Sequence, residues 1–223
     1  MSFKTALQTQ SLAVIAEIKR RSPSKGNLAA ITNPIALAQK YILGGANALS
    51  ILTDENFFHG HIEDLSTIAH AIKSQPIPII RKDFIIDKLQ IAEAAIAGAS
   101  AILLIVAAIG KKIQELSAYA HTLNLDVLTE VHNYDELQLA LDCGANIIGI
   151  NNRDLQTFAI DTQRALQLIT KIPKNIITVA ESGITSAKLA QEYYQAGFNA
   201  VLIGEALVTA DNPANLIQEI HHE

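Results

Sequence analysis

The chain has 223 residues, of which 49% are hydrophobic and 17% are charged, and its formal net charge at pH 7 is −5. This length suits one α/β domain with a single large core, and the apolar content argues against a disordered chain. The dispersed Lys and Arg residues exclude the basic footprint of a protein that binds nucleic acid or an anionic membrane.

The start of the chain and its cysteine content predict a cytoplasmic protein. The polar segment MSFKTALQTQ lacks the apolar stretch of a signal peptide. The longest apolar run, at 101–109, is about half of the roughly 20 residues that a membrane helix needs. Cys143 is the single cysteine, so no intramolecular disulfide can form. We therefore expect no membrane partner.

Four similar segments recur along the chain, and each reads as a helix end, a turn and a buried strand. They are GGANALSIL at Gly44, AGASAILLI at Ala97, CGANIIGIN at Cys143 and AGFNAVLIG at Ala196. A glycine directly after a helical pattern is typical of a helix C-terminus, and the β-rich run after it suits a strand. The spacing between the segments is too long for one strand–helix unit and fits two, so a further strand is expected in each interval.

The intervening strands are present. They are LAVIAEIK, PIPIIRKDF, DVLTEVH and NIITVAES, and amphipathic helical patterns separate all eight strands. Eight buried strands alternating with helices predict a single-domain (β/α)₈ TIM barrel over residues 1–223. An open doubly wound sheet is the alternative. The stretch 22–32, which contains SPSKG, has no clear element and follows the first strand on the expected catalytic face.

Polar residues stand at the C-terminal ends of five predicted strands, on the side that faces the barrel interior. Side chains two residues apart share a face of a strand, and on that face apolar residues are followed by Glu17 and Lys19, Lys82, Glu130, Asn151 and Arg153, and Glu181. Any one of them has an ordinary explanation as an exposed strand end or a structural ion pair. Five strands converging on one end of a barrel favour an active site.

The loops after the last two strands, AESGI and IGEAL, predict a phosphate site. Barrels commonly hold phosphate there with backbone N–H groups, and Gly183 and Gly204 would permit close approach, although both glycines could simply turn the chain. His59 and His61 lack a third ligand at a recognisable spacing, so no metal site is expected. Neither GxGxxG nor a Walker A motif is present, and no organic cofactor is expected. His132 has the same parity as Glu130 and is expected to hydrogen-bond locally.

Six motifs resemble the indole-3-glycerol-phosphate synthase family, in order and from Val14 to Pro213. They are IAEIKRRSPSKG at Ile15, LTDENFFHG at Leu52, IIRKDFIID at Ile79, TEVHNYDEL at Thr129, GINNRDLQTF at Gly149 and ESGI at Glu181. The resemblance implies conversion of 1-(2-carboxyphenylamino)-1-deoxyribulose 5-phosphate to indole-3-glycerol phosphate, with loss of carbon dioxide and water, in tryptophan biosynthesis.

The resemblance also implies roles. Lys82 matches the general acid, Lys19 a residue that binds the anthranilate carboxylate, and Asn151 and Arg153 substrate-orienting positions. Glu17 and Glu130 would stabilise the positively charged ring, and which of Lys19, Glu17 and Glu130 serves the dehydration stays open. The remaining implied positions are Ser22, Gly183, Gly204 and the backbone N–H of Glu205 around the phosphate, Phe58, Phe84 and Leu103 along the aromatic pocket, and Glu181 and Ser182 at its floor.

One feature departs from the family pattern, because only about a dozen residues precede Val14 where relatives carry an extra helix across the barrel mouth. We expect most of that helix to be lacking and the site to be more open. Two alternatives remain: a phosphate-binding barrel with lost or altered activity, and phosphoribosylanthranilate isomerase, whose cysteine near the end of strand 1 is replaced here by Glu17 and Lys19. The expected partner is a phosphorylated small molecule, and the protein is expected to be a monomer, with association with other tryptophan-pathway enzymes left open.

Overall fold

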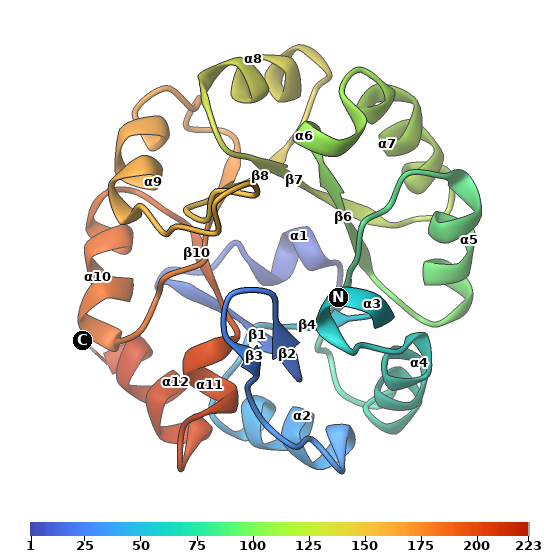
Figure 1. Ribbon diagram of the computed structural model, residues 1–223, viewed down its shortest axis with the longest axis vertical. Coiled ribbons are helices and arrows are strands. Elements are labelled where there is room, and N and C mark those ends of the chain that lie inside the picture. The colour runs from blue at the N-terminus through green and yellow to red at the C-terminus, as the bar shows by residue number, and fades with distance from the viewer. Residues whose placement is uncertain (223) are drawn as a thin grey trace.

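Eight parallel strands close into one barrel in the computed structural model, which describes residues 1–222 (Figure 1). The barrel strands are β1 (Ala13–Ile18), β4 (Ala48–Leu52), β5 (Ile79–Lys82), β6 (Ala101–Ile105), β7 (Asp126–Val131), β8 (Ile147–Asn151), β9 (Ile177–Glu181) and β10 (Ala200–Ile203). They neighbour one another in chain order, and β10 pairs with β1 to complete the ring. The predicted TIM barrel is confirmed, and the alternative of an open sheet is wrong.

Helices form a ring outside the barrel, as Figure 1 shows. The longer ones are α2 (Pro34–Leu43), α4 (Ile62–Ala71), α5 (Lys88–Ile96), α7 (Lys112–Thr122), α8 (Tyr134–Asp142), α9 (Thr162–Ile169), α10 (Ala187–Gln195) and α12 (Pro213–His222), and four one-turn helices are α1 (Phe3–Ala6), α3 (Glu55–Phe58), α6 (Val106–Ile109) and α11 (Glu205–Val208). Side-chain caps begin several of them, including Asn33, Asp87, Asn133 and Ser186. Each such cap satisfies a backbone N–H that the first helical turn leaves without an acceptor. Within residues 1–222, every helix falls short of the length and apolarity needed to span a membrane.

Alternate side chains of each strand fill the barrel interior, and the others pack under the helices. The interior cluster takes Ile15 from β1, Leu128 from β7 and Val179 from β9, whereas the outer cluster takes their neighbours along each strand. This is the parity assigned from the sequence. It places the polar residues at the C-terminal ends of the strands inside the same interior.

Residues before β1 fill the N-terminal end of the barrel. Phe3 and Leu7 are fully buried in the interior cluster, and the backbone N–H of Lys4 donates to Asp126 Oδ2 at 2.8 Å, at the first residue of β7. The short helix α1 therefore lies at the end of the barrel opposite to the polar strand ends.

The segment after β1 differs from the expected irregular loop. Its residues Arg21–Ser22 (β2) and Gly26–Asn27 (β3) pair antiparallel and form a small hairpin around the SPSKG motif. The positive φ of Gly26, 69°, allows the tight turn between two strands of only two residues each. Strands this short carry almost no pattern, which explains why the sequence did not reveal them.

Candidate active site

A cavity of about 920 Å³ opens at the C-terminal ends of the barrel strands. Every site residue expected from the sequence lines it: Glu17, Lys19, Ser22, Phe58, Lys82, Phe84, Leu103, Glu130, Asn151, Arg153, Glu181, Ser182, Gly183, Gly204 and Glu205. They come from all eight barrel strands or the loops that follow them. The closed sheet thus brings into one space residues that lie up to 188 positions apart in the chain, from Glu17 to Glu205.

Lys82 stands between two buried carboxylates. Its Nζ lies 3.4 Å from Glu130 Oε2 and 3.4 Å from Glu181 Oε2, and the two carboxylate side chains are almost completely buried. Burial disfavours the ammonium, but the charges of Glu130, Glu181 and Glu17 outweigh it and raise the pKa of Lys82. Lys82 is therefore a cation at neutral pH.

The two carboxylates around Lys82 have unequal partners. Glu130 also contacts His132, whose Nε2 lies 3.2 Å from Glu130 Oε1. Burial opposes the ionisation of Glu130, yet Lys82, His132 and Asn151 hold its pKa well below the usual range. Neither oxygen of Glu181 accepts a hydrogen bond from residues 1–222, although Lys82 Nζ lies 3.4 Å from Oε2. Burial, with the charges of Glu130 and Glu17, raises the pKa of Glu181 to about 8, so one carboxylate is ionised and the other is protonated at neutral pH.

A second ion pair lies on the β1 side of the cavity. Lys19 Nζ is 2.9 Å from Glu17 Oε1, and both side chains are at most 14% exposed. The hydroxyl of Ser50 on β4 donates to the other oxygen, Glu17 Oε2, at 3.4 Å. Glu17 thus has a donor on each oxygen, which fixes the direction in which its carboxylate faces.

Aromatic side chains form one wall of the cavity near α3. The ring centroid of Phe84 lies 6.1 Å from that of Phe57 and 6.3 Å from that of Phe58. Leu103 on β6 is almost fully buried and adds an aliphatic surface. This wall suits a flat apolar ligand group.

The loops after β9 and β10 have the backbone geometry expected at a phosphate site. Ser182 and Gly183 both have positive φ, 65° and 81°, so two successive residues take the left-handed conformation. Gly204 precedes the one-turn helix α11, whose first N–H groups have no intrahelical acceptor. The carboxylate of Glu205 pairs with Lys25 of the β2–β3 hairpin, which leaves its backbone N–H as the group that could face an anion.

Arg153 and Asn151 connect β8 to the loops around the mouth. Arg153 Nη1 donates to Ser24 Oγ at 2.8 Å and to the carbonyl of Phe158 at 3.2 Å. Asn151 Oδ1 accepts the backbone N–H of Arg153 at 2.9 Å. These bonds place the guanidinium at the entrance between the hairpin and the β8–α9 loop.

Sequence reasoning missed three features of the site. Ser50 has the inward parity of β4, and the same alternation would have revealed it. Gly149 on β8 leaves room for Glu181, which only the assembled barrel shows. Arg81, the residue before Lys82, faces outward under α5 and donates hydrogen bonds to Thr53, Asp83 and the carbonyl of Gln90. It was missed because an arginine at the end of a strand is usually expected to be exposed.

Comparison with known proteins gives one consistent family. Residues 1–220 match the family described as indole-3-glycerol phosphate synthase. An indole-3-glycerol phosphate synthase of Opitutus terrae is 46% identical over 223 residues, covering 98% of this chain and 84% of that protein. One of Chloroherpeton thalassium is 44% identical over 207 residues, covering 92% of this chain and 78% of that protein.

Solved structures share the fold at much lower identity. 3-Hexulose-6-phosphate synthase from Salmonella typhimurium superposes with a TM-score of 0.75 at 13% identity, covering 94% of this chain and 97% of that one. Thiamine phosphate pyrophosphorylase from Pyrococcus furiosus gives a TM-score of 0.71 at 15% identity, covering 94% and 93%. At such identity these likenesses show the barrel architecture alone.

Proposed function

Because this chain belongs to the indole-3-glycerol phosphate synthase family, we propose that its cavity performs that reaction with the residue roles below. The enzyme is a carboxy-lyase of tryptophan biosynthesis, and its substrate is a phosphorylated small molecule. The observation that carries the proposed roles is the buried Lys82, whose Nζ lies 3.4 Å from each of the carboxylates of Glu130 and Glu181.

Lys82 supports ring closure. The aromatic carbon attacks the ketone of the substrate, and the carbonyl oxygen gains negative charge as the bond forms. An ammonium already in place stabilises that charge and then supplies a proton to the strongly basic alkoxide. The neighbouring carboxylates keep Lys82 charged until that step.

Glu130 stabilises the opposite charge. The ring becomes positive when its carbon attacks, and it loses that charge as carbon dioxide leaves. A carboxylate that stays ionised inside a buried cavity stabilises a nearby positive charge far more strongly than one in water. Glu130 fits this task because Lys82 and His132 keep it ionised.

Glu17 and Lys19 fit the dehydration that follows. The ring-closed intermediate must lose a hydroxide, which needs an acid, and a proton from carbon, which needs a base. Lys19 and Glu17 place an ammonium and a carboxylate 2.9 Å apart on one strand end. Lys19 protonates the leaving hydroxyl and Glu17 accepts the carbon-bound proton, and a lysine ammonium has enough donors to bind the substrate carboxylate as well.

Binding orients the substrate across the cavity. The anthranilate ring lies against Phe58, Phe84 and Leu103, over the floor formed by Glu181 and Ser182. The phosphate lies against the backbone N–H groups of Gly183, Gly204 and Glu205 and the hydroxyl of Ser22. Asn151 and Arg153 bind the part of the substrate that lies between the anthranilate ring and the phosphate. Ser22 is 3% exposed and accepts a backbone bond from Lys25, so its hydroxyl is held in place before substrate arrives.

The test is direct. Purified protein is mixed with 1-(2-carboxyphenylamino)-1-deoxyribulose 5-phosphate, and indole fluorescence is followed. We expect turnover by the native chain and its abolition by Lys82→Met, with substrate affinity within about tenfold, because an acid used mainly in the transition state contributes little to binding. A native chain that binds the substrate without turnover at high enzyme concentration would instead support a binding protein.

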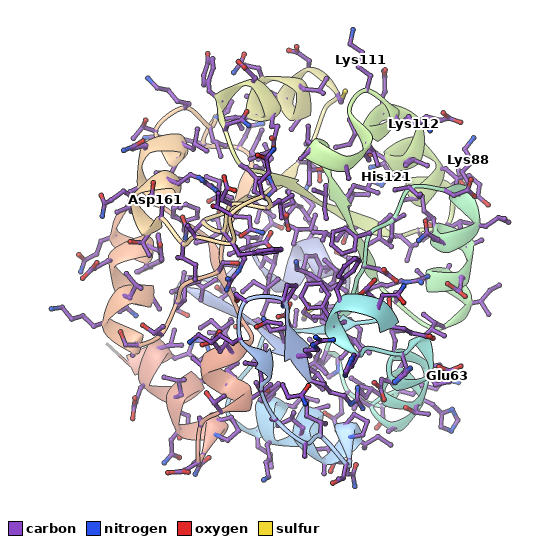
Figure 2. The ribbon with its side chains drawn as sticks, viewed as in Figure 1. Glu63, Lys88, Lys111, Lys112, His121 and Asp161 are labelled. Carbon is purple, nitrogen blue, oxygen red and sulfur yellow. The ribbon has the colours of Figure 1, made fainter. Side chains whose placement is uncertain are left out.

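Lys88→Met is the matched control. Lys88 points outward from the helical ring in Figure 2 and pairs with Glu115 at 2.6 Å on the surface. The same chemical change there should leave kcat and KM unaltered. If Lys82→Met keeps most of its kcat, Lys82 has no place in the mechanism.

A further inference from the structure

His132 joins the site to the protein surface through two carboxylates. It follows β7, and its imidazole lies between Glu130 in the cavity and Glu136 on α8. The distances are 3.2 Å from Nε2 to Glu130 Oε1 and 3.0 Å from Nδ1 to Glu136 Oε2. The side chain of His132 is 9% exposed, so both contacts are made away from bulk water.

The start of α8 holds this histidine in place. The N-cap residue Asn133 donates from Nδ2 to Glu136 Oε1 at 2.7 Å and accepts the backbone N–H of Glu136 at 2.9 Å. Glu136 Oε2 also accepts the backbone N–H of His132 at 2.8 Å. Glu136 therefore has little freedom to leave the imidazole, and the helix start fixes the direction in which Nε2 points.

The charged groups facing His132 are carboxylates. Glu130 lies on its own strand end and Glu136 on α8, while Lys82 of β5 and Asn151 of β8 lie beyond, around Glu130. Burial disfavours the imidazolium, but the two carboxylates outweigh it and raise the pKa of His132 to about 9. The histidine is therefore a cation over the physiological range.

Glu181 provides an internal comparison. Its Oε2 lies at the same distance from Lys82 Nζ as Glu130 Oε2 does, yet its own oxygens have no hydrogen-bond donor among the described residues. Glu130 has an additional ion-pair partner in His132 Nε2, at 3.2 Å, although this buried nitrogen makes no hydrogen bond within the described residues. His132 stands on the Glu130 side. Two buried carboxylates sharing one lysine cannot easily both ionise, and a cation beside one of them decides which does.

We propose that His132 is a positioning residue whose imidazolium, anchored by Glu136, keeps Glu130 ionised and directed into the cavity and so leaves the proton on Glu181. This inference rests on the proposed function for its effect on turnover. Its effect on charge does not depend on any substrate.

Two substitutions separate charge from shape. His132→Gln can place a neutral donor near Glu130, and His132→Asn can keep a donor near Glu136 while losing the contact with Glu130. Both remove the cation, so in both the pKa of Glu130 should rise. We expect kcat to fall by about tenfold or more at pH 6 and to recover toward higher pH, with KM changed much less, since Glu130 acts on the transition state. A histidine that only supports the fold would lower Tm without moving the pH profile.

The control is His121→Gln. His121 also bonds locally, to the carbonyl of Leu125 at 3.1 Å, and Figure 2 places it in the outer ring on α7. That variant should keep the native pH profile. If His132→Gln does so too, the cation is not needed and the proposal fails.

A second measurement is independent of activity. The imidazole resonances of His132 are titrated by NMR in the native chain and in Glu130→Gln, with a midpoint near pH 9 expected in the native chain and a drop of about one unit or more in the variant. A native midpoint near 6.5 would overturn the proposal. A high midpoint in a chain that does not turn over the substrate would overturn the proposed function and leave the pairing of His132 with Glu130 intact.

Discussion

Glu181 occupies the space that a side chain on Gly149 would take. A β-carbon built on Gly149 of β8 would stand 2.0 Å from Glu181 Oε1 and 3.2 Å from Leu128 Cδ1. The first distance is far below any normal contact, so Glu181 can lie across the barrel interior only because position 149 is glycine. The two residues lie on paired strands and are offset by two positions, because Gly149 is in register with Val179 and Asn151 with Glu181.

Gly149→Ala should therefore lower activity by displacing Glu181. The backbone of Gly149 has no positive φ, so the added methyl group acts through its contact and not through backbone strain. We expect kcat to fall by about 10- to 100-fold while the barrel still folds, because a misplacement of about 1 Å in a preorganised site has an effect of this size. Steady-state kinetics with circular dichroism would measure both.

Gly144→Ala is the matched control for that change. Gly144 lies in the turn between α8 and β8, has φ of 78°, and has open space where its β-carbon would stand. Alanine there should reduce stability by about 1 kcal/mol through the left-handed conformation. Its kcat should stay native, so equal losses of kcat in the two variants would mean that stability, and not the position of Glu181, governs the result.

Glu181→Gln should stabilise the protein, and more so at high pH. The folded pKa of Glu181, about 8, lies above the value of about 4.3 for an unfolded glutamate, so the folded chain binds the extra proton between these values. Native stability is consequently lost as pH rises through this window, and an uncharged amide removes that loss. We expect the gain in the free energy of unfolding to be near zero at about pH 4.5 and to reach about 4–5 kcal/mol at about pH 8.

Urea denaturation of the native and Gln chains at these two pH values measures the difference. A gain that is the same at both would show that Glu181 does not change its protonation in the window. A loss at pH 8 would mean that the ionised carboxylate stabilises the fold through Lys82. Activity at the same pH values shows whether the stability gained is at the expense of turnover, as active sites often require.

Periodicity predicted the barrel and the charged strand ends that line the cavity, whereas the aromatic wall and Ser22 were expected only from the family resemblance. Inward parity along each strand was enough to collect Glu17, Lys82 and Glu130, and a closed parallel barrel necessarily brings its strand ends together. The unequal partners of Glu130 and Glu181 were not predictable. They depend on the orientation of the His132 imidazole and on the space that Gly149 leaves for Glu181. The spacing of residues along one sequence reveals neither.

Arg81→Met tests another feature that the pattern did not reveal. The guanidinium of Arg81 donates to Thr53 Oγ1 at 3.0 Å, to Asp83 Oδ2 at 3.0 Å and to the carbonyl of Gln90 at 2.8 Å. The side chains of Arg81 and Asp83 are only 6% and 11% exposed. Removing the cation deprives the buried carboxylate of Asp83 of its ion-pair partner and leaves it only the hydroxyl of Thr53 and the N–H of Phe84 as donors, which should cost about 3–5 kcal/mol of stability.

The double variant Arg81→Met with Asp83→Asn distinguishes this explanation from lost packing. It removes the stranded charge, so it should recover a clear part of the stability lost by the single variant in urea denaturation. No recovery would mean that the cost arises from the packing of the arginine stem, its bonds to Gln90 and Thr53, and its ion pair with Glu93 at 2.6 Å.

Gly183→Val should weaken the binding of substrate and of inorganic phosphate together. Gly183 has φ of 81°, and its β-carbon would stand 2.6 Å from Ile160 Cγ2 and 3.4 Å from Thr162 Cγ2. A branched side chain must therefore shift the loop after β9, whose N–H groups are proposed to hold the phosphate. We expect affinity for both ligands, measured by calorimetry, to fall by about tenfold or more, which is about 1.4 kcal/mol.

Two further variants separate the causes of that loss. Gly197→Val imposes the same kind of strain, with φ of 104° and open space around its β-carbon, at the turn before β10. It should reduce stability and leave phosphate affinity unchanged. Adding Ile160→Ala to Gly183→Val removes the nearest clash, so a restored phosphate affinity would mean that displacement by Ile160 was the cause. Phosphate affinity that stays low in the double variant would locate the effect at the backbone of Gly183 itself. Native phosphate affinity in Gly183→Val alone would mean that the phosphate binds away from this loop.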